Sequence, residues 1–101
     1  MRKIVLLCST GLSTSILVKK MKEEAKRLGY ECDIECYPLA NAGVMAKDAD
    51  VILLAPQVHS SLGEVKIKCP NVKVTVIDAK LYSVLDAEGI LDLAQKTVGD
   101  Y

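Results

Sequence analysis

The sequence has no tryptophan and no phenylalanine, and four tyrosines are its only aromatic residues. Half of the residues are nevertheless apolar, so the core must consist mainly of aliphatic side chains. An excess of charge is missing too, since 13 basic side chains balance 13 acidic ones. Proteins that bind nucleic acids normally carry a basic excess. We therefore expect no nucleic-acid partner.

Long apolar runs are also missing. The longest one, over residues 51–56, is far shorter than the roughly 20 residues that a membrane-spanning helix needs, and no signal-peptide pattern is visible. We expect residues 1–101 to form one domain in the cytoplasm, without direct insertion into a membrane. In that compartment cysteines stay reduced.

The scarcity of histidine argues against a metal site. His59 is the single histidine beside four cysteines. Cys32 and Cys36, the closest pair of cysteines, lie in an alternating, strand-like segment, so they should be about 13 Å apart at about 3.3 Å per residue. That separation is too large for a disulfide or a shared metal ion. We expect no metal and no other cofactor, and we interpret Cys32, Cys36 and Cys69 as structural.

A short apolar run followed by small polar residues stands near the start of the chain. Residues 4–7 are apolar and β-branched or leucine, which predicts a buried strand, and Cys8 follows directly. Residues 9–14 are small, polar or flexible apart from Leu12, and a helical pattern begins at Ser15. A strand, a tight loop and a helix N-terminus in this order form an anion site, because free backbone N–H groups converge there and the helix dipole favours negative charge.

Cys8 is the candidate nucleophile of this site, since a thiolate can attack phosphorus. The resulting thiophosphate ester needs hydrogen-bond donors, which the loop offers as backbone N–H groups and hydroxyls. Gly11 permits a backbone conformation that a side chain would resist. The predicted phosphate-binding residues are Ser9, Thr10, Gly11, Leu12, Ser13, Thr14 and Ser15.

The loop differs at one position from the phosphatase pattern Cys-x5-Arg. Thr14 stands six residues after Cys8, where a phosphatase has arginine. Without a guanidinium group the loop lacks the bidentate clamp that stabilises the transition state of hydrolysis. The sequence thus favours a phosphoryl carrier over a phosphatase.

The rest of the chain alternates between strand and helix patterns, which indicates parallel βαβ units. Because the first and third strands are continuously apolar, they should be central, and the alternating second and fourth should be edges. We predict a small flavodoxin-like α/β domain, with a four-stranded parallel sheet of order 2-1-3-4, helices on both faces and the phosphate-binding loop after the first strand. The predicted strands cover residues 4–7, 32–37, 50–55 and 72–78, and the predicted helices 15–28, 40–46, 60–68 and 87–98.

The first helix should bury one apolar face and end at Gly29. Its other face carries five positive and two negative side chains, among which Glu23 and Arg27 are spaced to form an ion pair. This face is either ordinary solvated surface or a docking surface for an acidic partner. The residues predicted to be buried are Ile16, Leu17, Met21, Ala25 and Leu28.

In such a sheet, ligands bind at the carboxyl ends of the strands, between the first and third. Cys8 lies there, and the loops that follow the third and fourth strands should face it. Those loops carry Gln57, His59, Asp78 and Tyr82. Asp78 stands where a phosphatase would hold its general acid, although aspartate at a strand end is also a common turn residue.

The segment of residues 8–15, Cys-Ser-Thr-Gly-Leu-Ser-Thr-Ser, closely resembles the phosphocysteine loop of the IIB components of the lactose/cellobiose (diacetylchitobiose) family. These proteins belong to the bacterial phosphoenolpyruvate-dependent sugar phosphotransferase system (PTS). The resemblance extends to residues 51–57 and to Val76-Ile77-Asp78 with Leu81-Tyr82, so it covers essentially the whole chain. One departure is Ala55, where relatives often have glycine.

The resemblance implies a four-stranded parallel sheet and a defined reaction. Cys8 would accept phosphate from a phosphohistidine of the IIA partner and pass it to a sugar held by the membrane-embedded IIC partner. The phosphate-binding role would carry over to Ser9 through Ser15, whereas His59 has no counterpart role in that pattern. Gln57, Asp78 and Tyr82 are neighbours of the implied site.

Two other classes of function stay open from the residues alone. One is a low-molecular-weight phosphatase or an arsenate-reductase-like enzyme, with Cys8 as nucleophile and Asp78 as acid. The other is a non-catalytic anion-binding module in which Cys8 is incidental. Thr14 in place of arginine argues against the first of these.

Overall fold

The computed structural model describes residues 1–9 and 14–100. Its four parallel strands form one sheet of order β2-β1-β3-β4, which confirms the predicted topology. The continuously apolar strands are central and the alternating ones are edges, as expected. The strands are β1 (Arg2–Cys8), β2 (Cys32–Pro38), β3 (Val51–Leu54) and β4 (Lys73–Val76).

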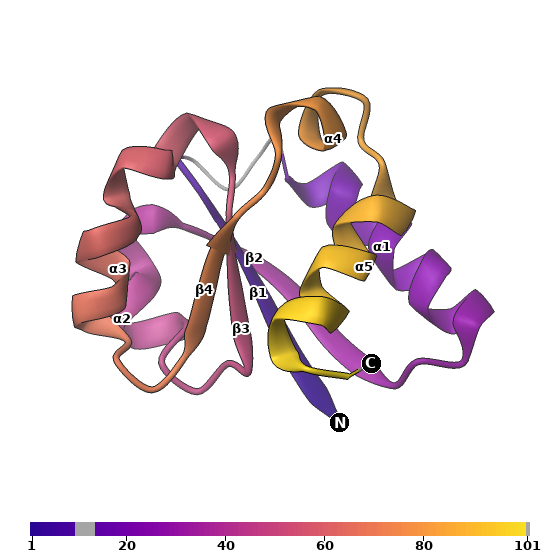
Figure 1. Cartoon of the computed structure of the whole chain (residues 1–101), viewed down its shortest axis with the longest axis horizontal. Coiled ribbons are helices and arrows are strands. Elements are labelled where there is room, and N and C mark those ends of the chain that lie inside the picture. The colour runs from indigo at the N-terminus through magenta and orange to yellow at the C-terminus, as the bar shows by residue number, and fades with distance from the viewer. Residues whose placement is uncertain (10–13, 101) are drawn as a thin grey trace.

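Helices cover both faces of the sheet (Figure 1). Helices α1 and α5 pack side by side on one face, and α2 and α3 pack on the other. The helical segments are α1 (Ser15–Leu28), η1 (Leu39–Asn41), α2 (Ala42–Met45), η2 (Pro56–Ser61), α3 (Leu62–Lys68), α4 (Ala79–Ser83) and α5 (Ala87–Val98).

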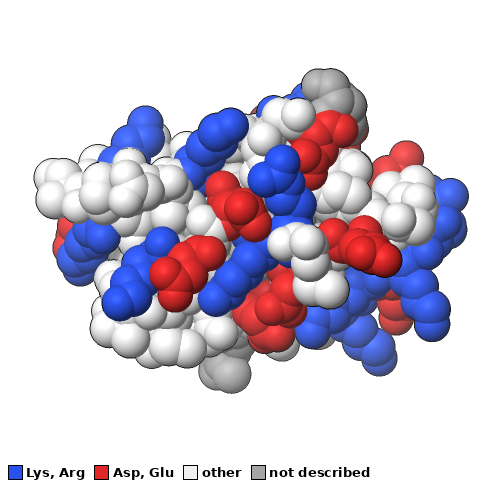
Figure 2. Space-filling model, turned by 90° about the horizontal axis from the view of Figure 1, so that it is seen from below, with Lys and Arg blue, Asp and Glu red and all other residues white. Residues whose placement is uncertain are grey.

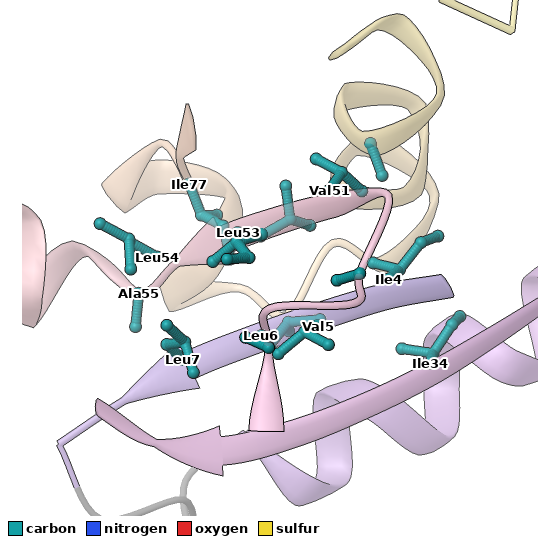
Figure 3. Close-up of a cluster of buried hydrophobic side chains, with 14 of the residues drawn as sticks. Ile4, Val5, Leu6, Leu7, Ile34, Val51, Leu53, Leu54, Ala55 and Ile77 are labelled. Carbon is teal, nitrogen blue, oxygen red and sulfur yellow. The ribbon is translucent and has the colours of Figure 1, made fainter. Parts of the chain in front are cut away.

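The two central strands form the middle of the core. Every residue from Ile4 to Cys8 and from Val51 to Leu54 is at most 1% exposed. Figure 3 shows side chains of β1 and β3 projecting to both sides of the sheet. Since successive residues of a strand point to opposite faces, a strand between two helical layers must be apolar at every position.

Helix α1 corrects two details of the predicted helix. Ile16 and Leu28 are 60% and 49% exposed, whereas Val18 is 7% exposed and packs in the core. The buried stripe is therefore turned by about one residue from the predicted one. Arg27 pairs with Glu24, with an Nη2–Oε2 distance of 2.6 Å, and not with Glu23.

Helix α4 was not predicted. It is five residues long, too short to show a helical period, and the carboxylate of Asp78 caps it by accepting the N–H of Lys80 at 2.8 Å. After the helix, Leu85 adopts a left-handed conformation with φ of 51°, where a glycine or asparagine would normally mark the helix end.

A polar cluster joins three distant segments at the amino end of the sheet. The Arg2 guanidinium donates to the Asp100 carboxylate, with an Nη2–Oδ1 distance of 2.6 Å, and the Tyr30 hydroxyl donates to the other carboxylate oxygen. Both hydrogen bonds hold the pKa of Asp100 below its usual value, while burial and the neighbouring carboxylate raise the pKa of Tyr30. Figure 2 shows this end of the molecule, where basic and acidic side chains alternate.

Gly89 in α5 allows a first test of the packing. A Cβ atom at this position would lie 2.9 Å from Asp86 Oδ2 and 3.0 Å from Leu81 Cδ2. The crowded Asp86 carboxylate is also the helix cap, since it accepts the Gly89 N–H. Loss of such a cap costs about 0.5–2 kcal/mol. We expect Gly89→Ala to lower the free energy of unfolding in urea by about 1 kcal/mol, despite the higher helix propensity of alanine.

Gly63 in α3 is the matched control. Among the described residues, no atom beyond its chain neighbours and its own helix backbone lies within 4 Å of the position of its Cβ, so Gly63→Ala should stabilise the protein by about 0.5–1 kcal/mol through helix propensity. Stabilisation by both substitutions would show that the side chains of Asp86 and Leu81 move away from an added methyl group at little cost in free energy.

The carboxylate of Asp100 gives a second prediction. Its pKa is depressed in the folded state, so its stabilising effect is present above the unfolded pKa of about 3.9 and is lost as the pH falls through the folded pKa. Asp100→Asn should lower the Tm by a few degrees at pH 7, and this difference should shrink steadily below about pH 4.

Asp92→Asn is the control variant, because within the described part of the chain Asp92 pairs only with the exposed Lys96, at 3.3 Å. It should change the Tm little at any pH. A difference between the wild type and Asp100→Asn that stays constant down to pH 2 would contradict the assigned role of the carboxylate.

Candidate functional site

Cys8 is the last residue of β1, at the carboxyl edge of the sheet. It pairs with Pro38 of β2 on one side. On the other side the Ala55 N–H donates to the Leu7 carbonyl at 2.9 Å, which extends the β1–β3 ladder beyond the end of β3. The chain passes from β1 to β2 on one side and then to β3 on the other side of β1, so Cys8 lies at the point where the strand order switches, the usual place for a ligand in such sheets.

The side chain of Thr14 lies against the sulfur of Cys8. Thr14 Oγ1 is 3.4 Å from Cys8 Sγ, and both residues are buried. The Thr14 carbonyl accepts the Val18 N–H at 2.9 Å, in the first hydrogen bond of α1. The N-terminus of a 14-residue helix therefore begins beside the thiol. Sequence reasoning grouped Thr14 with its loop, and gave no sign that its hydroxyl meets the sulfur.

The other residues predicted for the phosphate loop are only partly described. Ser9 and Ser15, which flank the loop, are exposed. The predictions for Thr10, Gly11, Leu12 and Ser13 lie outside the described residues.

The loop after β3 forms η2, and its two predicted polar residues differ in their surroundings. Gln57 is exposed, while the neighbouring Val58 is buried. His59 Nδ1 lies 2.9 Å from the Pro56 carbonyl oxygen. A carbonyl can only accept, so Nδ1 carries the proton and donates it.

After β4, Asp78 precedes α4 and Tyr82 lies within that helix. The Asp78 carboxylate caps α4, and Tyr82 is 9% exposed and packs in the core. Asp78 and His59 both line an open, largely apolar groove of about 670 Å³ at the ends of β3 and β4. The described lining of that groove does not include Cys8, Gln57 or Tyr82. The structure thus brings His59 and Asp78 together, beside the thiol site and not inside it.

The other cysteines are packing residues. All four cysteines are free thiols. Burial raises the pKa of the Cys69 thiol, whose sulfur donates to the Ala42 carbonyl at 3.5 Å and links α3 to α2. Burial also raises the pKa of the Cys32 thiol, with a contribution from Asp33. A raised pKa keeps a thiol protonated and unreactive.

The sequence matches the family model described as "PTS system, Lactose/Cellobiose specific IIB subunit" over residues 3–93. The chain belongs to this family. As PTS EIIB components, members of the family are phosphotransferases, and the predicted family is confirmed. Among the described residues, no helix is long and apolar enough to span a membrane.

Two curated relatives and a solved structure agree with this membership. The oligo-beta-mannoside-specific EIIB component of Bacillus subtilis (strain 168) is 38% identical, with 87% of each chain covered. The galactose-specific EIIB component of Lactococcus lactis subsp. cremoris (strain MG1363) is 34% identical, with 91% of this chain and 92% of that protein covered. The solution structure of the cellobiose-specific phosphotransferase IIB component of Borrelia burgdorferi is 28% identical, with a TM-score of 0.81 over 98% of this chain and 93% of that one.

Proposed function

We propose that this IIB chain carries a phosphoryl group on Cys8. The donor is a phosphohistidine of a IIA protein, and the acceptor is a sugar bound by a membrane-embedded IIC protein. The observation that carries the proposal is the contact between Cys8 Sγ and Thr14 Oγ1 at the start of α1. It supports a nucleophile next to a hydroxyl donor and a positive helix end.

The reaction takes place in two displacements at phosphorus. First the Cys8 thiolate attacks the phosphorus, an S–P bond forms, and the P–N bond breaks to release the imidazole of the donor. Then a sugar hydroxyl attacks the same phosphorus, the S–P bond breaks, and the thiolate is restored while the hydroxyl proton goes to a base or to solvent. A phosphohistidine is already a reactive donor, so positioning by amides and hydroxyls suffices without a metal or a nucleotide.

We assign the binding of the phosphoryl oxygens to the segment between Cys8 and α1. Thr14 is its best-supported member, because a hydroxyl that touches the sulfur also comes close to a phosphoryl group on that sulfur. Gln57 and Tyr82 stay as neighbours of the site. Asp78 caps α4 and lines a groove whose described lining does not include Cys8, which argues against a phosphatase with Asp78 as its acid. The proposed phosphate-binding residues are Ser9, Thr10, Gly11, Leu12, Ser13, Thr14 and Ser15.

The proposed sugar and the proposed place of action of this chain both depend on its IIC partner. The two curated relatives share 38% and 34% identity with this chain but are named for different sugars, which fits recognition of the sugar by IIC. We propose a β-linked disaccharide, such as cellobiose, lactose or diacetylchitobiose. We also propose that residues 1–101 act as one IIB domain in the cytoplasm, at the inner face of the membrane through IIC.

Replacing Cys8 by serine tests the nucleophile. The hydroxyl of Cys8→Ser is almost fully un-ionised at neutral pH, so the variant should take up no phosphoryl group from a phosphorylated IIA protein. It should also fail to support sugar phosphorylation by the assembled system. Intact-protein mass spectrometry after incubation with the donor measures the first result.

Three matched variants serve as controls, since they place the same substitution in other thiols. Cys32→Ser, Cys36→Ser and Cys69→Ser should still accept the phosphoryl group, and their losses should appear as lower stability. A phosphoryl group on Cys8→Ser with the acid lability of a phosphohistidine would move the site to His59 and contradict the proposal.

Thr14 can be tested by separating its hydroxyl from its shape. Thr14→Val keeps the shape and should slow phosphoryl transfer by about tenfold to a hundredfold, as expected when a hydrogen bond to a charged group is lost. Thr14→Ser keeps the hydroxyl and should retain most of the rate. Single-turnover uptake of phosphate provides the measurement, and equal rates for the two variants would assign Thr14 to packing alone.

A further inference from the structure

The first turns of α1 expose an apolar and cationic surface beside the site. Ile16 is 60% exposed, and Lys19 and Lys20 are exposed as well. We call Ile16, Lys19 and Lys20 the α1 entry surface. It directly follows Thr14, whose hydroxyl lies 3.4 Å from Cys8 Sγ.

The positive charges of this surface are not neutralised within the described part of the chain. Lys19 and Lys20 have no salt-bridge partner there, whereas Lys22 lies 3.9 Å from Glu35 and Arg27 is held by Glu24 at 2.6 Å. Glu23 offsets part of the charge on the same helix face.

A second apolar residue is exposed near the same edge. Val84, which directly follows α4, is 70% exposed. Figure 1 shows α4 and the start of α1 at the same end of the molecule, away from both chain ends. Single exposed apolar residues are ordinary, but here two of them flank the edge that holds Cys8.

We propose that the α1 entry surface is where the phosphoryl donor docks, through an acidic surface with an apolar centre. This inference rests on the proposed function. Cys8 lies at the edge where α1 begins, so a donor protein that brings its phosphohistidine to the sulfur covers the first turns of this helix. A phosphoryl group carries about −1.5 to −2 charges near neutral pH. Acidic side chains around it would complement Lys19 and Lys20, and Ile16 would meet the apolar centre.

Lys26 separates this proposal from docking on an anionic membrane. It lies seven residues after Lys19, about two turns along the same side of the helix, and it too is exposed and without a salt-bridge partner among the described residues. A flat membrane along α1 would use Lys19 and Lys26 alike. A donor that docks over the thiol reaches Lys19 and leaves Lys26 free.

The experiment compares Lys19→Gln with Lys26→Gln, the same change at the two ends of one stripe. The probe is a phosphorylated IIA protein of the lactose/cellobiose family, and the readout is the initial rate of phosphoryl uptake against donor concentration. Lys19→Gln should lower kcat/KM by about threefold at low ionic strength, and the loss should fade at high salt because exposed charges are screened. Lys26→Gln should retain the rate of the wild type.

Ile16 has its own matched control. Ile16→Ser should weaken donor binding, whereas Ile67→Ser should not, although Ile67 is 81% exposed on α3. Titration with the unphosphorylated IIA protein should shift the amide NMR signals of the first two turns of α1. The signals of residues 26–28 should not shift. These shifts show docking without relying on the transfer rate.

Equal losses for Lys19→Gln and Lys26→Gln would overturn the inference, and if both variants also lost binding to phosphatidylglycerol vesicles, the surface would belong to the membrane. Wild-type rates for Lys19→Gln and Ile16→Ser would overturn it as well. In both cases the wild-type chain still takes up phosphate, so the proposed function survives. A wild-type chain that takes up no phosphate would overturn the proposed function, and the docking inference with it.

Discussion

The burial of β1 and β3 on both faces is the constraint on which the site depends. With α1 and α5 on one side and α2 and α3 on the other, the central strands carry no polar side chain from Ile4 in β1, and from Val51 in β3, until they end. The parallel strands all end at the same edge, so polar groups collect there. Cys8 ends β1, Thr14 leads into α1, and the N-terminus of that helix adds a positive end beside the thiol. The anion site is thus a consequence of how the core is covered.

The parts of the fold that follow from this constraint could be predicted from the sequence. Residues 51–54 are apolar at every position, which places β3 in the centre, while the alternation of residues 32–37 places β2 at an edge. Cys8 followed directly from the same logic, since it comes where the first apolar run stops. The caps at Gly29 and Asp86 are local signals and were predictable for that reason.

The remaining details depend on contacts that a sequence pattern does not encode. Whether Ile16 or Val18 is buried depends on a rotation of α1 of about one residue, and both are apolar and near its N-terminus. By spacing alone, Arg27 could pair with either Glu23 or Glu24. It pairs with Glu24, and both side chains line a pocket between α1 and α5. The contact of Thr14 with the Cys8 sulfur depends on the path of the loop between them.

The cluster of Arg2, Asp100 and Tyr30 has a consequence for how the chain can be handled. It holds the first strand and the end of the last helix side by side, at the end of the molecule opposite to Cys8 (Figure 1). Arg2 and Cys8 stand at the two ends of β1, six residue steps apart, which is about 20 Å at about 3.3 Å per residue. A dye, a tether or a fused protein at either terminus would stay clear of the thiol. The adjacent ends also make the chain a good subject for circular permutation, in which a short linker joins them.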